Sequence, residues 1–383
     1  MKRKCVLYCS KQFPLIGLLS WQRTWRARAR SNSAHKEDRK LYKLHVVFAC
    51  DTEDNHPSYV PGWRSRGSNY DSNPSRLEWS WTRYWHDLSE LFRRRGVPIT
   101  WLIRVDNGPM WDCMLSLFRD EILGLKSVGD EIGIHIHTYV WRSKLSKWVQ
   151  TIDRKNEVEI VTRSIEMFER GLGFVPCSVR MGWNTMSNEI MRTLDSRGLL
   201  VDASAIPGTY CLGKFGNRDN IYDWSKASRE PYHPRSNDYQ RPGNMKILEM
   251  PISTCDTDRS TIMTGLINRL SAVKGSSALL SILPLVRRFD VNPNAGFYIS
   301  PWWSLSVSKR IIRTYCKKAC KDGVAYLIGF FHPCDIIDPK TGKKNALLEK
   351  CISTTIKEIQ DLSNIDVNFT TLSKIASIFE EEV

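Results

Sequence analysis

Several apolar segments of this chain end abruptly in a polar residue that can carry chemistry. The segment Leu44–Cys50 leads into Asp51, and Val324–Phe331 leads into His332. Along the chain, segments with apolar residues at every third or fourth position alternate with short β-like segments. This alternation favours a parallel sheet covered by helices. With about seven predicted strands and no internal repeat, the sequence predicts an α/β fold, a distorted (β/α) barrel.

One predicted strand, Glu131–His137, alternates apolar and polar side chains. Its three isoleucines share one face, toward the helices of the barrel, while His135 and His137 share the other. Two imidazoles at positions i and i+2 lie roughly 6–7 Å apart along a strand, a spacing that suits two ligands of one transition metal. The alternative is a pair of polar histidines satisfied by ordinary hydrogen bonds.

Three carboxylates, Asp51, Glu53 and Asp54, lie within four positions at the end of the first predicted strand. They would repel each other if all were ionised, and a bound cation would relieve that repulsion. The alternative, capping of a helix, is disfavoured because the next residues are rich in proline and glycine. One of these acids together with His135 and His137 would make a ligand set typical of catalytic zinc. A spare carboxylate could then take the proton of a metal-bound water.

Other polar residues also follow predicted strands. Because histidine titrates near neutrality, His332 suits a general acid, although it could instead cap the end of its strand. Arg180 could orient a carboxylate base through a charge-assisted pair. Asp202 could hold His332 and fix its tautomer. In a barrel these strand ends share one mouth, so the sequence predicts one catalytic site there.

The chain has 14 tryptophans, and some of them fall in predicted loops or at strand ends. Trp141, Trp183 and Trp224 are candidates for stacking on the apolar face of a sugar ring. Packing in the core explains a tryptophan equally well. The prediction that these three residues bind substrate therefore depends on whether their rings are exposed.

The net charge of +15 is concentrated in residues 1–40, which hold 11 Lys and Arg against two acidic residues. No nucleic-acid-binding module accompanies this charge, so we expect no nucleic-acid partner. The run Phe13–Trp21 is too short to span a membrane, but it could make weak contact with an anionic membrane surface. We expect residues 1–40 to be a disordered or surface-associated tail and residues 41–383 to form the catalytic domain.

The 11 cysteines include no C-x-x-C pair and are predicted to be free thiols. Free thiols indicate a reducing compartment. Together with the tail, they lead us to expect a cytoplasmic protein, peripheral at the membrane if the tail binds there.

Five stretches, taken in order over about 51–335, resemble the motifs of the polysaccharide deacetylases, the NodB-homology group of carbohydrate esterases. No single motif is specific, but the ordered set is. The stretches are Cys50-Asp-Thr-Glu-Asp54, Gly129-Asp-Glu-Ile-Gly-Ile-His-Ile-His137, Val179-Arg-Met-Gly-Trp183, Val201-Asp-Ala-Ser204 and Phe330-Phe-His-Pro333.

The resemblance implies a (β/α) barrel of about seven strands and hydrolysis of N-acetyl groups on an amino sugar or polysaccharide, with release of acetate. It also implies a divalent metal, Zn²⁺ first, on His135, His137 and either Glu53 or Asp54. In addition it implies that Asp51 is the base steadied by Arg180 and that His332 is the general acid. One departure is that the family places its second histidine four residues after the first, where this chain has Tyr139. His137 would then have to take that role.

Two other functions fit the same residues. A metal-independent glycoside hydrolase needs two carboxylates about 5–10 Å apart, such as Asp51 with Asp202 or Glu249. A non-catalytic carbohydrate-binding protein on the same fold would need neither a metal nor turnover. The identity of the sugar is left open, and the predicted loops 55–77 and 205–244 are expected to set specificity.

Overall fold

The computed structural model describes residues 42–52, 87–105, 115, 118–142, 147–151, 153–212, 221–256, 294–299, 305–333 and 346–382. The chain divides into two compact units, Met1–Leu41 and Tyr42–Val383, and every described residue belongs to the second. The predicted tail, the predicted loop at 55–77 and most of 258–295 therefore lie outside the described residues. Within the described ranges, no helix is both long and apolar enough to cross a membrane.

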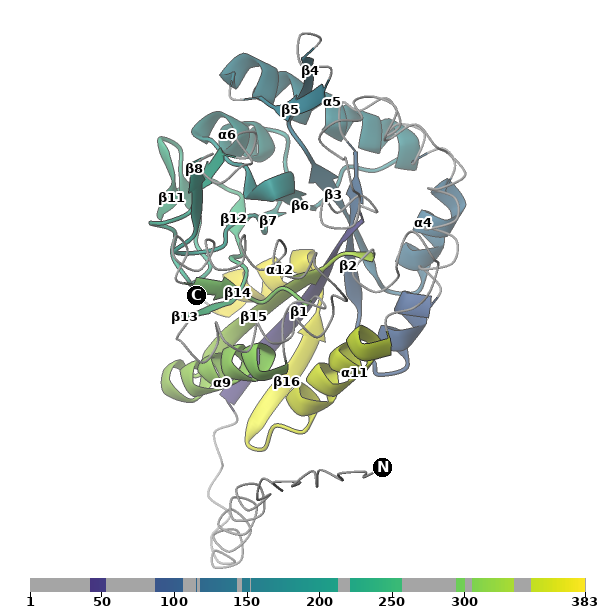
Figure 1. Cartoon of the computed structure of the whole chain (residues 1–383), viewed down its shortest axis with the longest axis vertical. Coiled ribbons are helices and arrows are strands. Elements are labelled where there is room, and N and C mark those ends of the chain that lie inside the picture. The colour runs from purple at the N-terminus through teal and green to yellow at the C-terminus, as the bar shows by residue number, and fades with distance from the viewer. Residues whose placement is uncertain are drawn as a thin grey trace, which may run out of the picture. The chain divides into compact units, whose positions relative to one another are not determined.

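The centre of the second unit is a curved sheet of parallel strands in the order β12-β7-β6-β3-β2-β1-β15, and β16 pairs with the first half of β1 (Figure 1). This arrangement confirms the predicted distorted (β/α) barrel. The strands are β1 (Tyr42–Thr52), β2 (Ile99–Arg104), β3 (Glu131–Ile136), β6 (Ser178–Met181), β7 (Val201–Asp202), β12 (Leu248–Glu249), β15 (Val324–Phe331) and β16 (Ile365–Thr370).

Helices other than α12 lie around the outside of the sheet, and the ends of α5 and α6 follow local sequence signals. The side chain of Asp153 accepts hydrogen bonds from the first free backbone N–H groups of α5, and Gly173 ends that helix with a φ of 84°. Ser187 caps α6 in the same way. The helices are α4 (Arg119–Ser127), α5 (Arg154–Leu172), α6 (Asn188–Ser196), α9 (Leu305–Asp322), α11 (Ala346–Gln360) and α12 (Leu372–Glu382).

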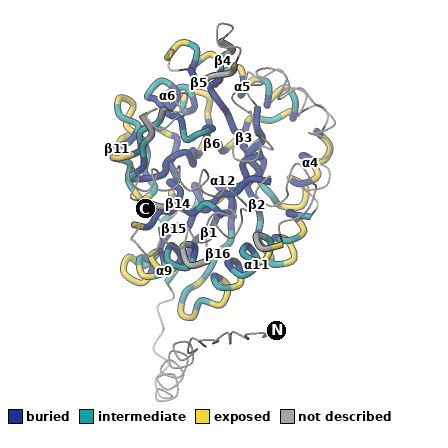
Figure 2. Tube along the Cα trace, viewed as in Figure 1, coloured by how far each residue is buried: buried dark blue, intermediate teal, exposed yellow. Residues whose placement is uncertain are grey.

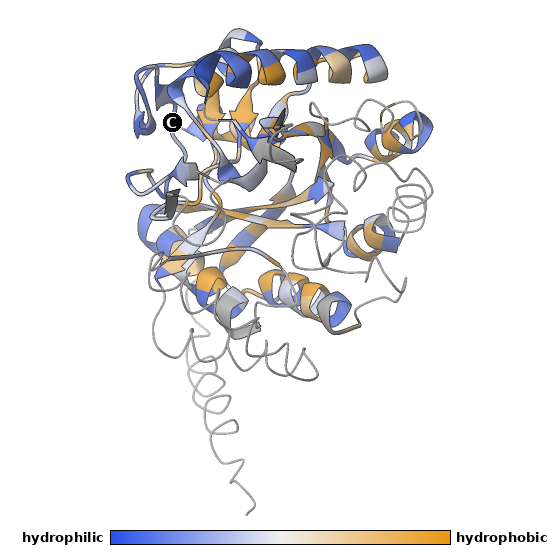
Figure 3. Cartoon of the chain, turned by 45° about the horizontal axis from the view of Figure 1, so that its top comes forward, coloured by the Kyte–Doolittle hydropathy of each residue, from blue (hydrophilic) through white to orange (hydrophobic). Residues whose placement is uncertain are grey.

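Strand β1 is buried on both faces, as a strand in the middle of a parallel sheet must be. Val46 and Phe48 pack in a large apolar cluster shared with the surrounding helices, whereas Val47 and Ala49 pack in a second cluster on the opposite face. Figure 2 shows the burial concentrated along the central strands, and Figure 3 shows the apolar faces of the helices turned toward them. Register therefore fixes which side chains of β1 reach the interior.

Helix α12 fills the inside of the curved sheet with Leu372, Ile375 and Ala376. Its first turn is held by the sheet, because the N–H of Leu372 donates to Oγ1 of Thr100 (3.0 Å) and the N–H of Ser373 donates to a Glu131 carboxylate oxygen (2.8 Å). At its other end, Glu382 accepts from Lys43 and Tyr326. The barrel interior at this end is thus closed by the chain itself.

The segment predicted as a long loop, 205–244, contains two hairpins, which corrects that prediction. They are formed by β8 (Tyr210–Leu212) with β9 (Ile221–Asp223) and by β10 (Pro234–Arg235) with β11 (Asp238–Pro242). Strands of two to five residues are too short to leave an alternating pattern. Two further antiparallel pairs are formed by β4 (Tyr139–Arg142) with β5 (Lys147–Gln150) and by β13 (Thr254–Asp256) with β14 (Asn294–Gly296).

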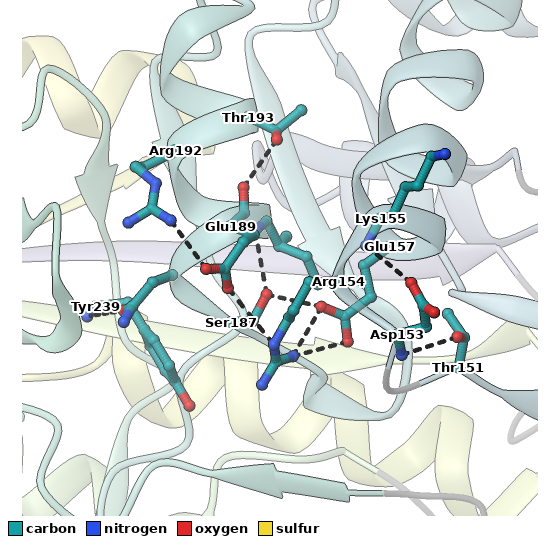
Figure 4. Close-up of polar contacts among 12 residues, drawn as sticks. Thr151, Asp153, Arg154, Lys155, Glu157, Ser187, Glu189, Arg192, Thr193 and Tyr239 are labelled. Atoms are coloured by element: carbon teal, nitrogen blue, oxygen red, sulfur yellow. Dashed lines mark hydrogen bonds and ion pairs between the residues drawn. The ribbon is translucent and has the colours of Figure 1, made fainter.

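A buried carboxylate fastens α5 to α6. Glu157 accepts two hydrogen bonds from Arg154 and a third from Ser187, the residue that caps α6. Figure 4 shows Arg154 lying between Glu157 and Glu189 on the two helices. Because α6 follows the strand that carries Arg180, this network fixes the chain just beyond the candidate site.

Candidate active site

The two histidines predicted as metal ligands meet in the structure. His135 is the in-register neighbour of Arg180 across β3 and β6, and its Nδ1 lies 2.8 Å from the backbone carbonyl oxygen of Arg180. A carbonyl only accepts, so Nδ1 carries the proton and Nε2 presents a lone pair. Nε2 of His135 lies 3.1 Å from Nε2 of His137. This short distance agrees with the prediction that the two imidazoles lie on the same face of the strand.

Two neighbours define where the His137 ring lies. Tyr139 stacks on it, with ring centroids 5.0 Å apart and planes inclined by 16°. A Cβ added at Gly182 would come within 2.4 Å of three His137 ring atoms, so only glycine fits there. Tyr139, which stands where the family has its second histidine, thus supports the His137 ring.

Asp51 lies at the end of β1 and is fully buried. Nη1 of Arg180 donates a hydrogen bond to Oδ2 of Asp51, and Nε2 of His332 lies 3.6 Å from the same oxygen. Among the described residues, no donor forms a hydrogen bond with Oδ1 of Asp51. The predicted pairing of Arg180 with Asp51 is therefore present, and one carboxylate oxygen is left to accept a proton.

Arg180 itself is held from several directions. Its Nη2 donates to Oδ1 of Asn184 (2.8 Å), and its guanidinium carbon lies 3.9 Å from the centre of the Phe330 ring. Burial lowers the pKa of Arg180 to about 10, with nearby Asp202 and Glu249 opposing the shift. Since this pKa is still far above neutrality, Arg180 stays charged beside Asp51.

The backbone that follows Arg180 is strained. Trp183 and Asn184 have φ values of 55° and 56°, in the left-handed region that non-glycine residues rarely adopt. Asn184 is held there by Arg180 at its side chain and by Trp224, whose Nε1 donates to the Asn184 carbonyl oxygen at 2.9 Å. Strain of this kind costs about 1–3 kcal/mol per residue and gathers at functional sites.

His332 ends β15 and is mostly buried. Its Nδ1 lies 3.1 Å from the hydroxyl of Tyr298, and the two rings meet edge to face. The Tyr298 ring also stacks on Phe330, with centroids 4.7 Å apart. Tyr298 therefore occupies the place at Nδ1 that the sequence predicted for Asp202.

Asp202 is buried among other partners, which corrects its predicted role. Its Oδ1 accepts a 2.5 Å hydrogen bond from Ser204, and Glu249 is its in-register neighbour on β12. It interacts with Arg180 through charge rather than with His332. Because β7 is only two residues long, the sequence pattern gave little indication of where this side chain would point.

The three predicted tryptophans have different outcomes. Trp224 is completely buried and packs edge to face on Tyr239, so it cannot offer a ring to a sugar, and that prediction is wrong. Trp183 is half-buried and its Nε1 donates to the Tyr139 hydroxyl. The side chain of Trp141 lies outside the described residues, as do Glu53 and Asp54.

The histidine pair fits a divalent metal. Ligand nitrogens bind zinc at about 2.0–2.1 Å, so two Nε2 atoms 3.1 Å apart can share one ion. His135 also donates its other ring N–H to a backbone carbonyl, the usual support for a metal-binding histidine. In the described part of the chain, no group of three His, Cys, Asp or Glu is placed to hold a metal. The predicted third ligand, Glu53 or Asp54, falls outside that part.

Sequence reasoning missed Gly182, Asn184 and Tyr298. Gly182 and Asn184 had a weak signal, because Gly182 lies inside the third motif and Asn184 directly follows it, but the sequence gave neither residue a role. Tyr298 had none beyond its place in a short segment that could be a strand. Its role depends on β15 and the 294–299 segment coming together, which only the tertiary structure brings about.

No protein-family model matches the sequence, and no curated protein matches it. Among solved structures, a candidate polysaccharide deacetylase from Mycobacterium smegmatis superposes with a TM-score of 0.50 at 15% identity, over 91% of this chain and 93% of that one. A 4-alpha-glucanotransferase from Thermococcus litoralis aligns with a TM-score of 0.41 at 11% identity, over 88% of this chain and 38% of that one.

A pseudoenzyme of the CE4 family from Bacillus anthracis aligns with a TM-score of 0.35 at 10% identity, over 86% of this chain and 66% of that one. The last two overlaps are too loose to support a comparison of function. The first, which spans nearly the whole of both chains, agrees with the parallel sheet and its helices. This chain therefore resembles the polysaccharide deacetylases and has their distorted (β/α) barrel fold.

Proposed function

We propose that this protein is a divalent-metal-dependent hydrolase that removes N-acetyl groups from an amino sugar or polysaccharide. The observation that carries the proposal is the approach of two histidine Nε2 atoms to 3.1 Å beside Asp51. The ordered motifs and the shared fold support the same reaction class.

Each side chain of the site has a role in this reaction. Asp51 takes a proton from the attacking water through Oδ1, because Oδ2 is occupied by Arg180. Arg180 keeps Asp51 ionised and oriented. His332 gives a proton to the departing nitrogen from Nε2 while Tyr298 holds Nδ1. The C–N bond of the acetamide breaks, and the products are acetate and a free amine.

A divalent metal would be held by His135 and His137, with Glu53 or Asp54 as the proposed carboxylate ligand. Bound there, it would polarise the amide carbonyl and lower the pKa of water. Asp51 and His332 are the residues suited to proton transfer. Nε2 of His332 lies 3.6 Å from Oδ2 of Asp51, so the acid and the base are neighbours.

A metal-independent glycoside hydrolase is disfavoured by the carboxylates that it would use. Asp202 and Glu249 are in-register neighbours on β7 and β12, where Oδ1 of Asp202 accepts from Ser204 and Oε1 of Glu249 accepts from the N–H of Ala205. These internal hydrogen bonds already engage the acids that would have to pair with Asp51. A non-catalytic carbohydrate-binding protein remains a competing proposal that the experiment below separates.

The test is acetate release from N-acetylated amino-sugar oligomers, measured together with the metal content of the purified protein. We expect one metal per chain in the wild type, with activity that is lost on chelation and restored by Zn²⁺. His135→Ala should lose both metal and activity. His233→Ala is the matched control, because His233 contacts Glu380 far from these residues in the fold. Full activity in the chelated protein would refute the proposal, and sugar binding without turnover would favour the non-catalytic alternative.

A further inference from the structure

Two buried carboxyl groups lie side by side beneath the candidate site. Asp202 and Glu249 are in-register neighbours on the parallel strands β7 and β12, and neither is exposed to solvent. One oxygen of each is satisfied, since Oδ1 of Asp202 accepts from Ser204 and Oε1 of Glu249 accepts from the N–H of Ala205.

The remaining oxygens, Oδ2 of Asp202 and Oε2 of Glu249, have no donor among the described residues. Two ionised carboxylates in contact, away from water, would repel each other strongly, and each would lack a hydrogen bond. A single proton between them removes the repulsion and satisfies both oxygens at once. Pairs of this kind titrate as one unit.

We propose that Asp202 and Glu249 share one proton and act together as a singly charged group that stabilises the Arg180 guanidinium. The proton resides on Glu249, which donates to Asp202. The role assigned to Arg180 rests on the proposed function, whereas the shared proton does not. Glu249 is on this view a positioning residue that acts through Asp202 and Arg180.

The charges around the pair agree with this assignment. Burial raises the pKa of Glu249 well above its usual value, and the neighbouring Asp202 raises it further. Arg180 on β6 is the nearby cation, and Tyr232, which is bonded through its backbone to Glu249, is the other titratable group. The pKa of Tyr232 is raised by burial and by both carboxyl groups, so Tyr232 stays neutral.

Glu249→Gln removes the titratable proton but keeps the shape of the side chain. An amide has the shape of a protonated carboxyl group, can donate to Asp202 and can still accept from Ala205. We expect the variant to fold and to be at least as stable as the wild type near pH 7.

The wild type should lose stability relative to Glu249→Gln as the pH rises from about 5 to about 8, with the slope of one bound proton. The sign follows because the folded wild type keeps a proton that the unfolded chain has released. Glu157→Gln is the matched control, since it replaces a buried glutamate whose oxygens already have donors from Arg154 and Ser187. That control should be destabilised. Parallel stability curves for wild type and Glu249→Gln, or a collapse of Glu249→Gln near pH 7, would overturn the shared proton.

The charge is tested separately with amide variants. Asp202→Asn and Glu249→Gln each leave one negative charge in the pair, whereas the double variant leaves none. We expect kcat of the double variant to be at least tenfold below that of either single variant, with KM little changed. A double variant no slower than the singles would overturn the role at Arg180. If the wild type released no acetate at all, the proposed function would fail while the stability curves would still decide the shared proton.

Discussion

Gly182→Ala is the sharpest test of the histidine pair. The added Cβ would lie 2.4 Å from three atoms of the His137 ring, whereas ordinary carbon contacts begin near 3.5 Å. The ring therefore has to recede by about 1 Å, and its stacking on Tyr139 has to shift with it. Metal–ligand distances tolerate only about 0.2 Å. A displacement of that size should stop the two Nε2 atoms from binding the same ion.

Loss of one ligand position should weaken metal binding at least about 100-fold, which is about 2.7 kcal/mol of binding free energy. If the ring cannot recede, the overpacking should instead lower the free energy of unfolding by about 1–3 kcal/mol. Zinc affinity is measured by titration against a competing chelator, and stability by denaturant unfolding of the metal-free protein.

Gly124→Ala is the matched control, because nothing lies within 4 Å of the Cβ that it would add on α4. It should leave zinc affinity unchanged and stabilise the helix by about 1 kcal/mol at most. If Gly182→Ala bound zinc as tightly as the wild type while remaining fully folded, the inferred metal geometry at His137 would be refuted.

Three further results are expected. Tyr298→Phe keeps the ring but loses the hydroxyl at His332, so kcat should fall about fivefold with KM unchanged, in line with a lost hydrogen bond of about 1 kcal/mol; an unchanged kcat would show that the hydroxyl does not hold His332. Arg180→Lys removes the planar fork that contacts Asp51, and acetate release should drop about 100-fold with the fold intact by circular dichroism. Burial lowers the pKa of His45, so the folded protein resists protonation there, and wild-type stability should fall relative to His45→Gln as the pH drops below about 6.5. Urea midpoints at several pH values check the last expectation, and equal pH dependence in the two proteins would contradict it.

The parts of the site that lie on one regular strand could be predicted from sequence. The alternation in β3 placed His135 and His137 on one face, because side-chain direction in a strand depends only on position parity. The pairing of Arg180 with Asp51 could also be predicted, since both side chains follow strands whose carboxyl ends meet at one edge. The barrel itself followed from the order of strands and helices.

The parts that depend on long-range packing could not be predicted. Tyr298 reaches His332 only because a short segment crosses beside β15, and nothing in its own sequence marks it. Asp202 was given the wrong partner because a two-residue strand gives no reliable face, and its true neighbour, Glu249, lies on another strand. Trp224 was misplaced because a tryptophan in a predicted loop has no periodic pattern to reveal its burial.

The position of α12 has a consequence for how the chain folds. The first strand, β1, completes its pairing when β15 and β16 are in place, and the apolar cluster behind it is completed by α12, which follows them. Contacts this distant in sequence form late and slow the search for the native state. A chain that ended before Leu372 would leave the apolar barrel interior open. Thr100 and Glu131 would also lose the hydrogen bonds that they accept from the N–H groups of α12. Such a chain should bind chaperones or aggregate, so completion of the fold depends on its final helix.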